Sequence, residues 1–312
     1  MLKIFDNNEF SNIINKDVSY LSFYEKYAES FDLNILYIVY LNSKKEATVA
    51  FIIFEKDNSI LHIAHYNYSF LWIKNNLKSK GSRLDFAEAV YLLKEKYDNI
   101  VLRLTNIEDL RAFSSNGFKI EIRYTFVKKT GDLNYSYGIQ KHYKRGRDLL
   151  KLKFDAEVDF EEIFRYQMSF LNKKRISVDK KVIYRYLNGL WNENKLIAFT
   201  VIGGNQLIYA SGVVSLNYME DVAYFLFCNT KDDKNKSAIN AFMYIEIQKR
   251  LFDLGINNFD YMGANIKSIA EFKHTLNPYL MPVYSIVCAR KIIDLIAIAR
   301  SVNFFLKRLL AI

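Results

Sequence analysis

Residues 237–263, SAINAFMYIEIQKRLFDLGINNFDYMG, decide the fold that we expect for this chain. Ser237 is of a residue type that caps helix N-termini, and Gly255 suits the left-handed residue that ends a helix. Between them, apolar residues recur at the spacing of one helix face: Ala238, Phe242 and Ile245. The short run at 258–262 then predicts a strand. A long helix leading into a short strand is therefore the centre of the expected fold.

Helix and strand patterns recur in a similar order on both sides of residue 133. In the second half we expect helices and strands at 160–171, 180–187, 196–202, 207–214, 221–227 and 281–289. In the first half we expect them at 12–31, 34–40, 47–54, 59–64, 82–97, 99–104, 108–114 and 119–128. The repeated order predicts an internal duplication of a mixed α+β domain, with a turn at 130–132 as the boundary. The expected domains are 1–133 and 134–289.

The composition is that of a globular protein with a substantial core. Hydrophobic residues make up 51% and aromatic residues 16% of the 312 positions, with only 11 glycines and 2 prolines. These values exclude collagen-like, proline-rich and disordered chains. Two cysteines, Cys228 and Cys288, cannot form a disulfide framework and lack metal-site spacing, so we expect no metal. Neither a secretory signal nor a transmembrane run is recognised, so we expect a cytoplasmic protein.

Positive charge is concentrated in the second part of the chain. The net charge is +10, from 44 basic and 34 acidic residues. Residues 1–133 hold 18 basic and 17 acidic residues, whereas 134–312 hold 26 and 17. Six basic residues lie between Lys141 and Lys153, with one acid, Asp148. Such a local field favours an anionic partner, namely phosphate, nucleic acid or an acidic lipid surface; a solvated face is the alternative.

The C-terminal segment, 290–312, has the pattern of a basic amphipathic helix. Arg290 and Arg308 fall on one side of such a helix, and the other side is apolar, with Leu295, Val302, Leu306 and Leu310. This pattern suits a helix that lies in a membrane interface, which would bring the protein to the inner face of the membrane. Docking onto the body of the protein or onto a dimer partner is the alternative.

The segment 257–286 resembles the closing motif of the FemAB-like family of peptidoglycan aminoacyltransferases. That motif is a strand ending in Asp-aromatic-x-Gly, a short gap, and a helix that bears Phe-Lys. The matching residues are Phe259-Asp260-Tyr261-Met262-Gly263 and Ile269-Ala270-Glu271-Phe272-Lys273. Further similar stretches are Asn116-Gly117-Phe118, Tyr124-Thr125, 141–153 and 238–255. The family consists of two tandem domains of the GCN5-related N-acetyltransferase (GNAT) fold, so the resemblance implies two GNAT-like domains, each with a mixed sheet flanked by helices.

The resemblance implies a catalytic role for Lys273. When an amine attacks a thioester or an aminoacyl ester, a fixed ammonium stabilises the tetrahedral oxyanion that forms. In the family the matching lysine has this role or binds donor phosphate, and Phe272 beside it would pack under the donor. An ordinary exposed helix lysine is the alternative. The chain departs from the family at 274–278, HTLNP, where a Phe-Gly or Gly-Gly turn is common.

Three more candidates come from the end of the expected strand, where binding groups are often presented. Asp260 is the second candidate catalytic residue and would orient the amine or a hydroxyl; an Asx turn or a helix cap is the alternative. Tyr261 is a candidate for substrate binding. Gly263 would let a ligand approach the backbone, or would supply a positive φ in a turn.

A basic segment lies where the family binds a phosphate-bearing substrate, and the resemblance implies that role for Lys141, Lys144, Arg145 and Arg147. Guanidinium groups suit diphosphate oxygens, so Arg145 is the best single candidate. Conventional acetyl-CoA enzymes of this fold place a glycine-rich turn at the start of the main helix. Here 230–237, TKDDKNKS, has no glycine and two carboxylates, which argues against ordinary coenzyme A binding there.

Taken together, the residues and the resemblance predict a FemAB-like N-acyltransferase that moves an activated aminoacyl or acyl group onto an amine of a cell-envelope precursor. We expect no tightly bound cofactor. The donor would be a co-substrate, aminoacyl-tRNA or acyl-CoA, and the acceptor a phosphate-bearing small molecule or a lipid-linked one. The alternatives are an acyl-CoA-dependent N-acyltransferase of polysaccharide or nucleotide-sugar biosynthesis, and a non-catalytic module that binds an anionic ligand.

Overall fold

The computed structural model describes residues 1–62, 68–74, 76–105, 107–173, 179–231, 234–262 and 267–289. Gly263 and the tail at 290–312 lie outside these residues. The chain forms two compact units: unit 1 takes its described residues from 1–123 and 282–289, and unit 2 from 124–281. The chain therefore passes from unit 1 to unit 2 within one strand and back to unit 1 within another. Neither point is the turn at 130–132, where the sequence places the domain boundary. No helix in the described part is long and apolar enough to cross a bilayer.

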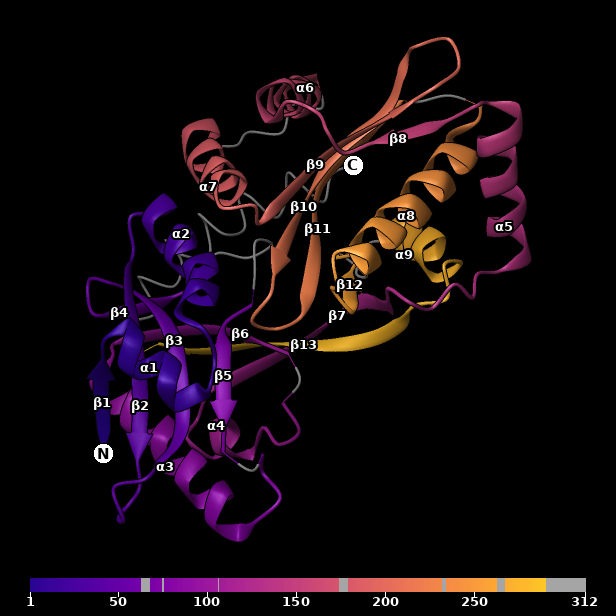
Figure 1. Cartoon of the computed structure of the whole chain (residues 1–312). Coiled ribbons are helices and arrows are strands. Elements are labelled where there is room, and N and C mark those ends of the chain that lie inside the picture. The colour runs from indigo at the N-terminus through magenta and orange to yellow at the C-terminus, as the bar shows by residue number, and fades with distance from the viewer. Residues whose placement is uncertain are drawn as a thin grey trace. The chain divides into compact units, whose positions relative to one another are not determined.

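Unit 1 contains the following elements (Figure 1): β1 (Leu2–Phe5), α1 (Asn7–Ile14), η1 (Val18–Leu21), α2 (Ser22–Ser30), β2 (Asn34–Leu41), β3 (Ala47–Lys56), β4 (Ser59–Leu61), β5 (Phe70–Ile73), α3 (Lys80–Lys96), β6 (Asn99–Leu104), α4 (Arg111–Ser115) and the first part of β7 (Lys119–Lys129). Unit 2 continues with α5 (Tyr137–Lys144), η2 (Arg145–Leu149), β8 (Lys153–Asp155), α6 (Phe160–Lys173), α7 (Lys180–Asn192), β9 (Leu196–Ile202), β10 (Ile208–Asn217), β11 (Val222–Thr230), α8 (Lys236–Asp253), β12 (Asn258–Asp260), α9 (Lys267–His274) and the start of β13 (Tyr279–Ala289).

Unit 1 is a mixed sheet with helices on both faces. Its strands follow one another in the order β1-β2-β3-β4-β6-β13-β7, and β5 pairs with β3. Side chains alternate across the strands, so one face presents Ile38, Phe51 and Leu102 to α3 and α4. The other face presents Tyr37 and Phe54 to the aromatic rings of α1 and α2. The two faces explain why the strands read as nearly continuous apolar runs.

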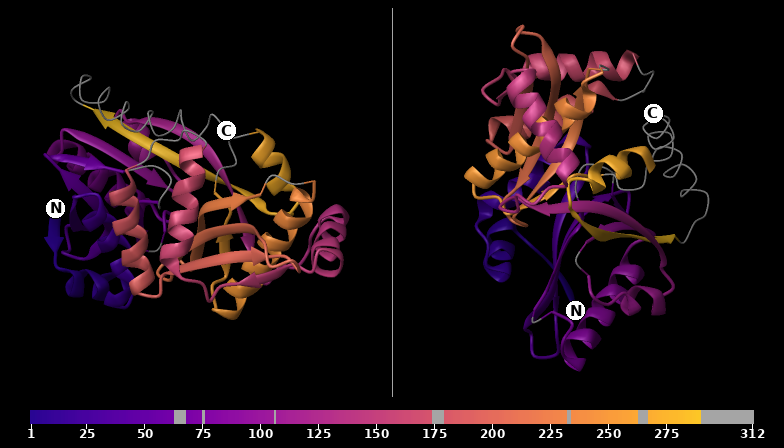
Figure 2. Two further views of the ribbon diagram at one scale, coloured as in Figure 1. Left: turned by 90° about the horizontal axis from the view of Figure 1, so that it is seen from above. Right: turned by 90° about the vertical axis from the view of Figure 1, so that its right-hand side faces the viewer.

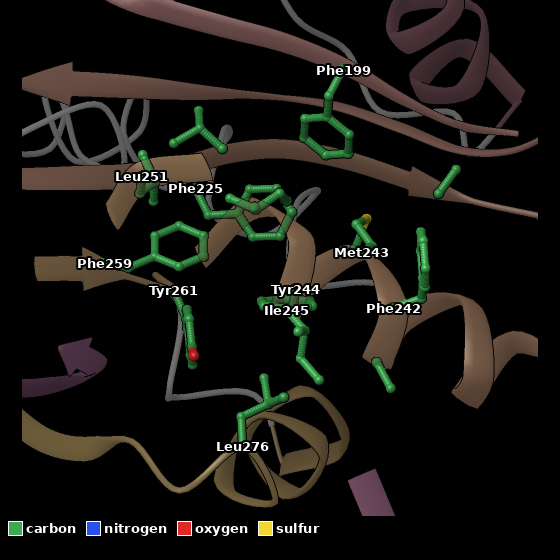
Figure 3. Packing of buried hydrophobic residues seen from close by; sticks show 14 of the residues in the cluster. Phe199, Phe225, Phe242, Met243, Tyr244, Ile245, Leu251, Phe259, Tyr261 and Leu276 are labelled. Carbon is green, nitrogen blue, oxygen red and sulfur yellow. The ribbon is translucent and has the colours of Figure 1, made fainter. Parts of the chain in front are cut away.

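Unit 2 repeats this plan around the strand order β7-β12-β11-β10-β9-β8. One face packs on α8, in a core that includes Phe199, Phe225 and Phe259 (Figure 3). The opposite face meets α6, where the side-chain amide of Gln167 donates to the carbonyl and the hydroxyl of Ser211, both at 2.9 Å. Figure 2 shows the helices on both faces of the sheet. The expected α+β class, with mixed sheets flanked by helices, is confirmed.

The sheet of each unit is completed by a strand that chain order assigns to the other half. Strand β12 of unit 2 pairs antiparallel with β7, through Asn258↔Lys129 to Asp260↔Val127. Strand β6 of unit 1 pairs antiparallel with β13, through Asn99↔Ala289 to Leu104↔Tyr284. Because the last strand of each repeat is exchanged, a boundary drawn between repeats in the sequence cannot coincide with the units.

The long helix predicted after Ser237 is α8, and both of its ends lie close to the predicted positions. The N-cap is Asn235, two residues before the predicted Ser237. At the C-terminus Gly255 has a φ of +75°, as predicted. The N–H groups of Gly255 and Ile256 donate to the carbonyls of Phe252 and Leu251, both at 3.0 Å. A connection of four residues, 254–257, then leads into β12, which ends at Asp260.

Gly212 on β10 tests the packing of unit 2. A Cβ added there would lie 2.5 Å from the Phe227 carbonyl oxygen and 2.7 Å from Phe199 Cζ. We expect Gly212→Ala to lower the free energy of unfolding by about 1–3 kcal/mol, because the rigid neighbours must shift. Urea denaturation measures this change.

The matched control is Gly138→Ala on α5, where the added Cβ meets nothing within 4 Å. Alanine favours the helix, so this variant is expected to be neutral or stabilised by up to about 1 kcal/mol. Equal stability of the two variants would contradict the packing described for Gly212.

Candidate active site

The candidate site is built where two parallel strands of unit 2 separate. Strands β11 and β12 pair only from Val222↔Asn258 to Tyr224↔Asp260, and β11 then runs on to Thr230. An extra residue in β11, Leu226, interrupts its pairing with β10, since Val213 faces Phe227 and Val214 faces Phe225. Bulges increase local strand twist. Ligands of α/β sheets bind outside the carboxyl ends of parallel strands. We call this place the unit 2 fork.

Asp260, the last residue of β12, is a fully buried carboxylate. Its Oδ1 accepts a hydrogen bond from the Thr125 hydroxyl of β7 at 2.5 Å. The same oxygen accepts the Met262 N–H at 2.7 Å, which is the Asx turn considered from the sequence. The carboxylate therefore bends the chain away from the sheet at the fork and holds that bend on a neighbouring strand.

Lys273 on α9 reaches the same bend from the other side. Its side chain is 7% exposed, which excludes the ordinary surface lysine. The ammonium donates to the Tyr261 carbonyl at 2.6 Å and to the Met262 carbonyl. The third N–H has no partner among the described residues. Burial lowers the pKa of Lys273 to about 8, while the negative charge of Asp260 acts in the opposite direction.

Cys228 on β11 lies beside this ammonium. Its Sγ is 3.6 Å from the Thr230 hydroxyl and 3.5 Å from the Met243 sulfur. Burial raises the pKa of the Cys228 thiol to about 11, although the positive charge of Lys273 partly opposes that shift. Since the thiol stays protonated at neutral pH, Cys228 is a small wall of the site and not a thiolate nucleophile.

Tyr261 and Phe272 form the apolar floor of the fork. Tyr261 is fully buried, with its ring 4.9 Å from that of Phe259 and 5.2 Å from that of Tyr244 (Figure 3). Phe272 is half-buried, with its ring 5.6 Å from that of Tyr244. The backbone carbonyl of Tyr261, and not its phenol, therefore faces Lys273. The phenol instead lies 3.4 Å from the Gln248 side-chain oxygen.

A second buried lysine, Lys128 of β7, holds the segment after α9. Its ammonium donates to Asp132 Oδ2 at 2.9 Å and to the carbonyls of Asn134 and Asn277 at 2.8 and 3.3 Å. It also lies 4.8 Å from the ring centre of Tyr135. Asn277 has a φ of +54°, a left-handed conformation that asparagine adopts more readily than most residues. Lys128 is thus a positioning residue for α9.

The basic segment on α5 and η2 is divided by the structure. Arg145 reaches the N-terminus of α8, where its guanidinium donates to Asn235 Oδ1 at 2.8 Å. Arg147 turns back onto Asp148, at 2.7 Å, and lies over the Tyr143 ring. Lys141 and Lys144 are exposed on α5. Of the four candidates, only Arg145 therefore lies at a helix N-terminus, a place that favours anions.

The sequence did not predict three residues of the site, namely Thr125, Lys128 and Cys228, as site residues. Thr125 lies 135 positions before its partner Asp260, and no local pattern links two such distant residues. The apolar run around Lys128 was the available signal, since a lysine inside a buried strand needs several acceptors. In the described part of the chain, no group of three His, Cys, Asp or Glu side chains is placed to hold a metal ion.

Solved structures resemble nearly the whole chain. FemX has a TM-score of 0.63 at 11% identity, over 91% of this chain and 96% of FemX. The C-terminal domain of a putative lysylphosphatidylglycerol synthetase from Agrobacterium fabrum has a TM-score of 0.54 at 11% identity, over 96% and 97% of the two chains. The fold is FemAB-like and of the GNAT type. A tandem GNAT protein from the clavulanic acid pathway, with a TM-score of 0.51 at 9% identity over 93% and 98%, agrees with the duplication.

The sequence itself matches no protein-family model and no curated protein. At 9–11% identity, the likeness to FemX and to the tandem GNAT protein is one of fold. The expected FemAB-like, tandem GNAT-type architecture is confirmed at that level. The roles of individual side chains rest on their own geometry.

The charge of Asp260 is expected to control the titration of Lys273. Asp260→Asn removes a negative charge that raises the lysine pKa, so the pKa of Lys273 should fall below about 8. Carbon-13 NMR of labelled lysine side chains measures this value, and loss of one signal in Lys273→Met assigns it.

Glu271→Gln, an exposed change on the same helix, is the control and should leave the Lys273 titration in place. An unchanged Lys273 pKa in Asp260→Asn would show that Asp260 is not the charge that the ammonium senses.

Proposed function

We propose that this protein is a FemAB-like N-acyltransferase that moves an activated aminoacyl or acyl group onto an amine of a cell-envelope precursor. The observation that carries the proposal is the buried ammonium of Lys273, fixed at the unit 2 fork with one N–H that has no partner in the described part of the chain. The names of the similar proteins support this direction. One of them is the C-terminal domain of a putative lysylphosphatidylglycerol synthetase, a name that joins an aminoacyl group to an anionic lipid.

The proposed reaction needs a positive charge at one atom. The lone pair of the acceptor nitrogen attacks the carbonyl carbon of the donor ester or thioester, and the carbonyl oxygen becomes an oxyanion. Collapse breaks the C–O or C–S bond, the leaving group departs with the electron pair, and the amine proton passes to it through solvent. The free N–H of Lys273 would stabilise the oxyanion in a site that excludes much water.

Two backbone carbonyls give the ammonium its direction. The bonds to Tyr261 and Met262 remove two of its three donors and fix where the third points. The lowered pKa leaves Lys273 mainly protonated at pH 7, by a ratio of roughly ten to one. The group is therefore cationic at neutral pH, as an oxyanion partner must be, and becomes neutral above pH 8.

Removal of the ammonium should abolish most turnover. We expect Lys273→Met to lower kcat by roughly 100- to 1000-fold, the usual effect of losing one oxyanion donor. In the native protein the rate should rise with pH as the acceptor amine loses its proton, and should fall as pH rises through about 8, where Lys273 loses its charge. The fall in rate above about pH 8 should be absent in Lys273→Met.

The matched control is Lys267→Met, which changes an exposed lysine on the same helix. It should keep both the rise and the fall of the rate with pH. Circular dichroism tests whether each variant is folded. Lys273→Gln serves if Lys273→Met is not, because its amide can donate to the two carbonyls. A folded Lys273 variant with full turnover would remove the residue from the mechanism.

The position of Arg145 supports a phosphate-bearing donor at the start of α8. Its guanidinium stands beside Asn235, the N-cap of an 18-residue helix whose dipole attracts anions. This arrangement offers a cation where conventional acetyl-CoA enzymes have a glycine-rich turn. It therefore favours acyl-CoA as the second candidate donor, beside aminoacyl-tRNA, and with it an enzyme of polysaccharide or nucleotide-sugar biosynthesis.

Arg145→Gln is expected to raise the KM for the donor about tenfold with little change in kcat, because the guanidinium contacts a part of the donor that does not react. The effect should shrink with added salt. Lys153→Gln, which removes the same charge from an exposed position on β8, is the control. Steady-state kinetics with acyl-CoA and with aminoacyl-tRNA shows which of the two compounds is the donor. Turnover of neither, with binding of anionic polymer alone, would favour the non-catalytic alternative.

A further inference from the structure

Unit 1 contains a strand fork of its own, built on the same plan. Strand β4 pairs in parallel with β6 over only two residue pairs, Ser59↔Asn99 and Ile60↔Ile100. β4 ends at Leu61, whereas β6 continues to Leu104. Beyond the residues that pair with β4, the backbone of β6 forms hydrogen bonds with Ser69. Its N–H donates to the Arg103 carbonyl at 2.7 Å, and its hydroxyl accepts the Arg103 N–H at 3.0 Å.

The strand alternation decides where Arg103 lies. Leu102 and Leu104 belong to the core under α3, so Arg103 between them lies on the opposite face, the one covered by α1 and α2. On the neighbouring strands, Ile286 of β13 and Ile120 of β7 pack on the α3 core. By the same alternation, Arg123 of β7 lies on the face of Arg103.

Arg103 is a buried cation. It is 9% exposed, and its guanidinium has no hydrogen bond or ion pair within the described part of the chain. Burial and the nearby charge of Arg123 both lower its pKa, which means that the surroundings disfavour the cation. Glu121 has only a small opposing effect, since it is already paired with Arg123 at 3.0 Å. An isolated buried charge is unfavourable and calls for a partner.

Two buried tyrosines lie near Arg103. Tyr27 and Tyr68 are 0% and 4% exposed. The Tyr27 ring is 4.6 Å from that of Phe54 and 6.2 Å from that of His62, so it is held rigidly. The neighbourhood of Arg103 thus combines a rigidly packed ring with a positive charge that no described carboxylate pairs with.

We propose that unit 1 holds a binding site for the oxyanion group, phosphate or carboxylate, of a small-molecule ligand, with Arg103 as its anchor and Arg123 beside it. A guanidinium presents two parallel N–H donors that match the two oxygens of either group. The excess of one positive charge over Glu121 suits a ligand with a single anionic group at this place. The inference does not depend on acyl transfer at the unit 2 fork.

The test uses the full chain labelled with nitrogen-15 in arginine. The Nε–H signal of Arg103 is identified by its loss in Arg103→Met. Inorganic phosphate and acetate are titrated separately at constant ionic strength. We expect a saturable shift of this signal with at least one of the two anions, and the responding anion names the chemical group of the ligand. No shift with either would overturn the proposal.

Protection against heat gives a second measurement that needs no labelled signal. The responding anion should raise the melting temperature of the native protein saturably, and its apparent affinity should fall at least tenfold in Arg103→Met. Arg111→Gln, an exposed arginine of unit 1, should keep the native affinity. Arg145→Gln should also keep it, which separates this site from the donor site of unit 2. An unchanged affinity in Arg103→Met would overturn the proposal.

If Arg103→Met does not fold, Arg123→Gln takes its place in the heat measurement. This substitution lies at a less buried position and removes the second cation of the same face. Weaker protection by the anion in Arg123→Gln supports the proposed site, and native protection contradicts it.

Discussion

The buried carboxylate of Asp260 is the interaction on which the geometry of unit 2 depends. It ends β12, bends the chain through the Met262 N–H and fastens the bend to Thr125 of the neighbouring strand. The bend turns the carbonyls of Tyr261 and Met262 toward Lys273. Its negative charge also makes the burial of the ammonium tolerable. One side chain thus sets both the shape and the electrostatics of the fork.

Much of the fold follows from local sequence signals. The helix–strand unit around Gly255 was predictable because a left-handed glycine and an apolar helix face are encoded within a few residues. The hairpin of β9 and β10 was predictable for the same reason. The exchange of β7 and β13 was not, because hydrogen bonding between strands carries no signature in either strand alone. Single apolar strands fit several sheets equally well.

The candidate site shows the same limit. The Phe-Lys helix and the Asp-aromatic strand end were visible as a pattern, and the structure brings Lys273 and Asp260 to one bend. The pattern could not reveal that Tyr261 offers its carbonyl and buries its phenol. Nor could it divide the basic segment, since Arg145 and Arg147 look alike in sequence and differ only in the partners that folding gives them.

The exchanged strands impose an order of events on synthesis of the protein. Leu104 of β6 pairs with Tyr284, so the sheet of unit 1 stays open on that side until β13 has been synthesised. The edge of β6 is exposed meanwhile, and an uncovered strand edge invites pairing with another chain. Unit 2 has its β7 strand from the outset and can close as soon as β12 emerges. The half of the chain made first is therefore the half that is finished last.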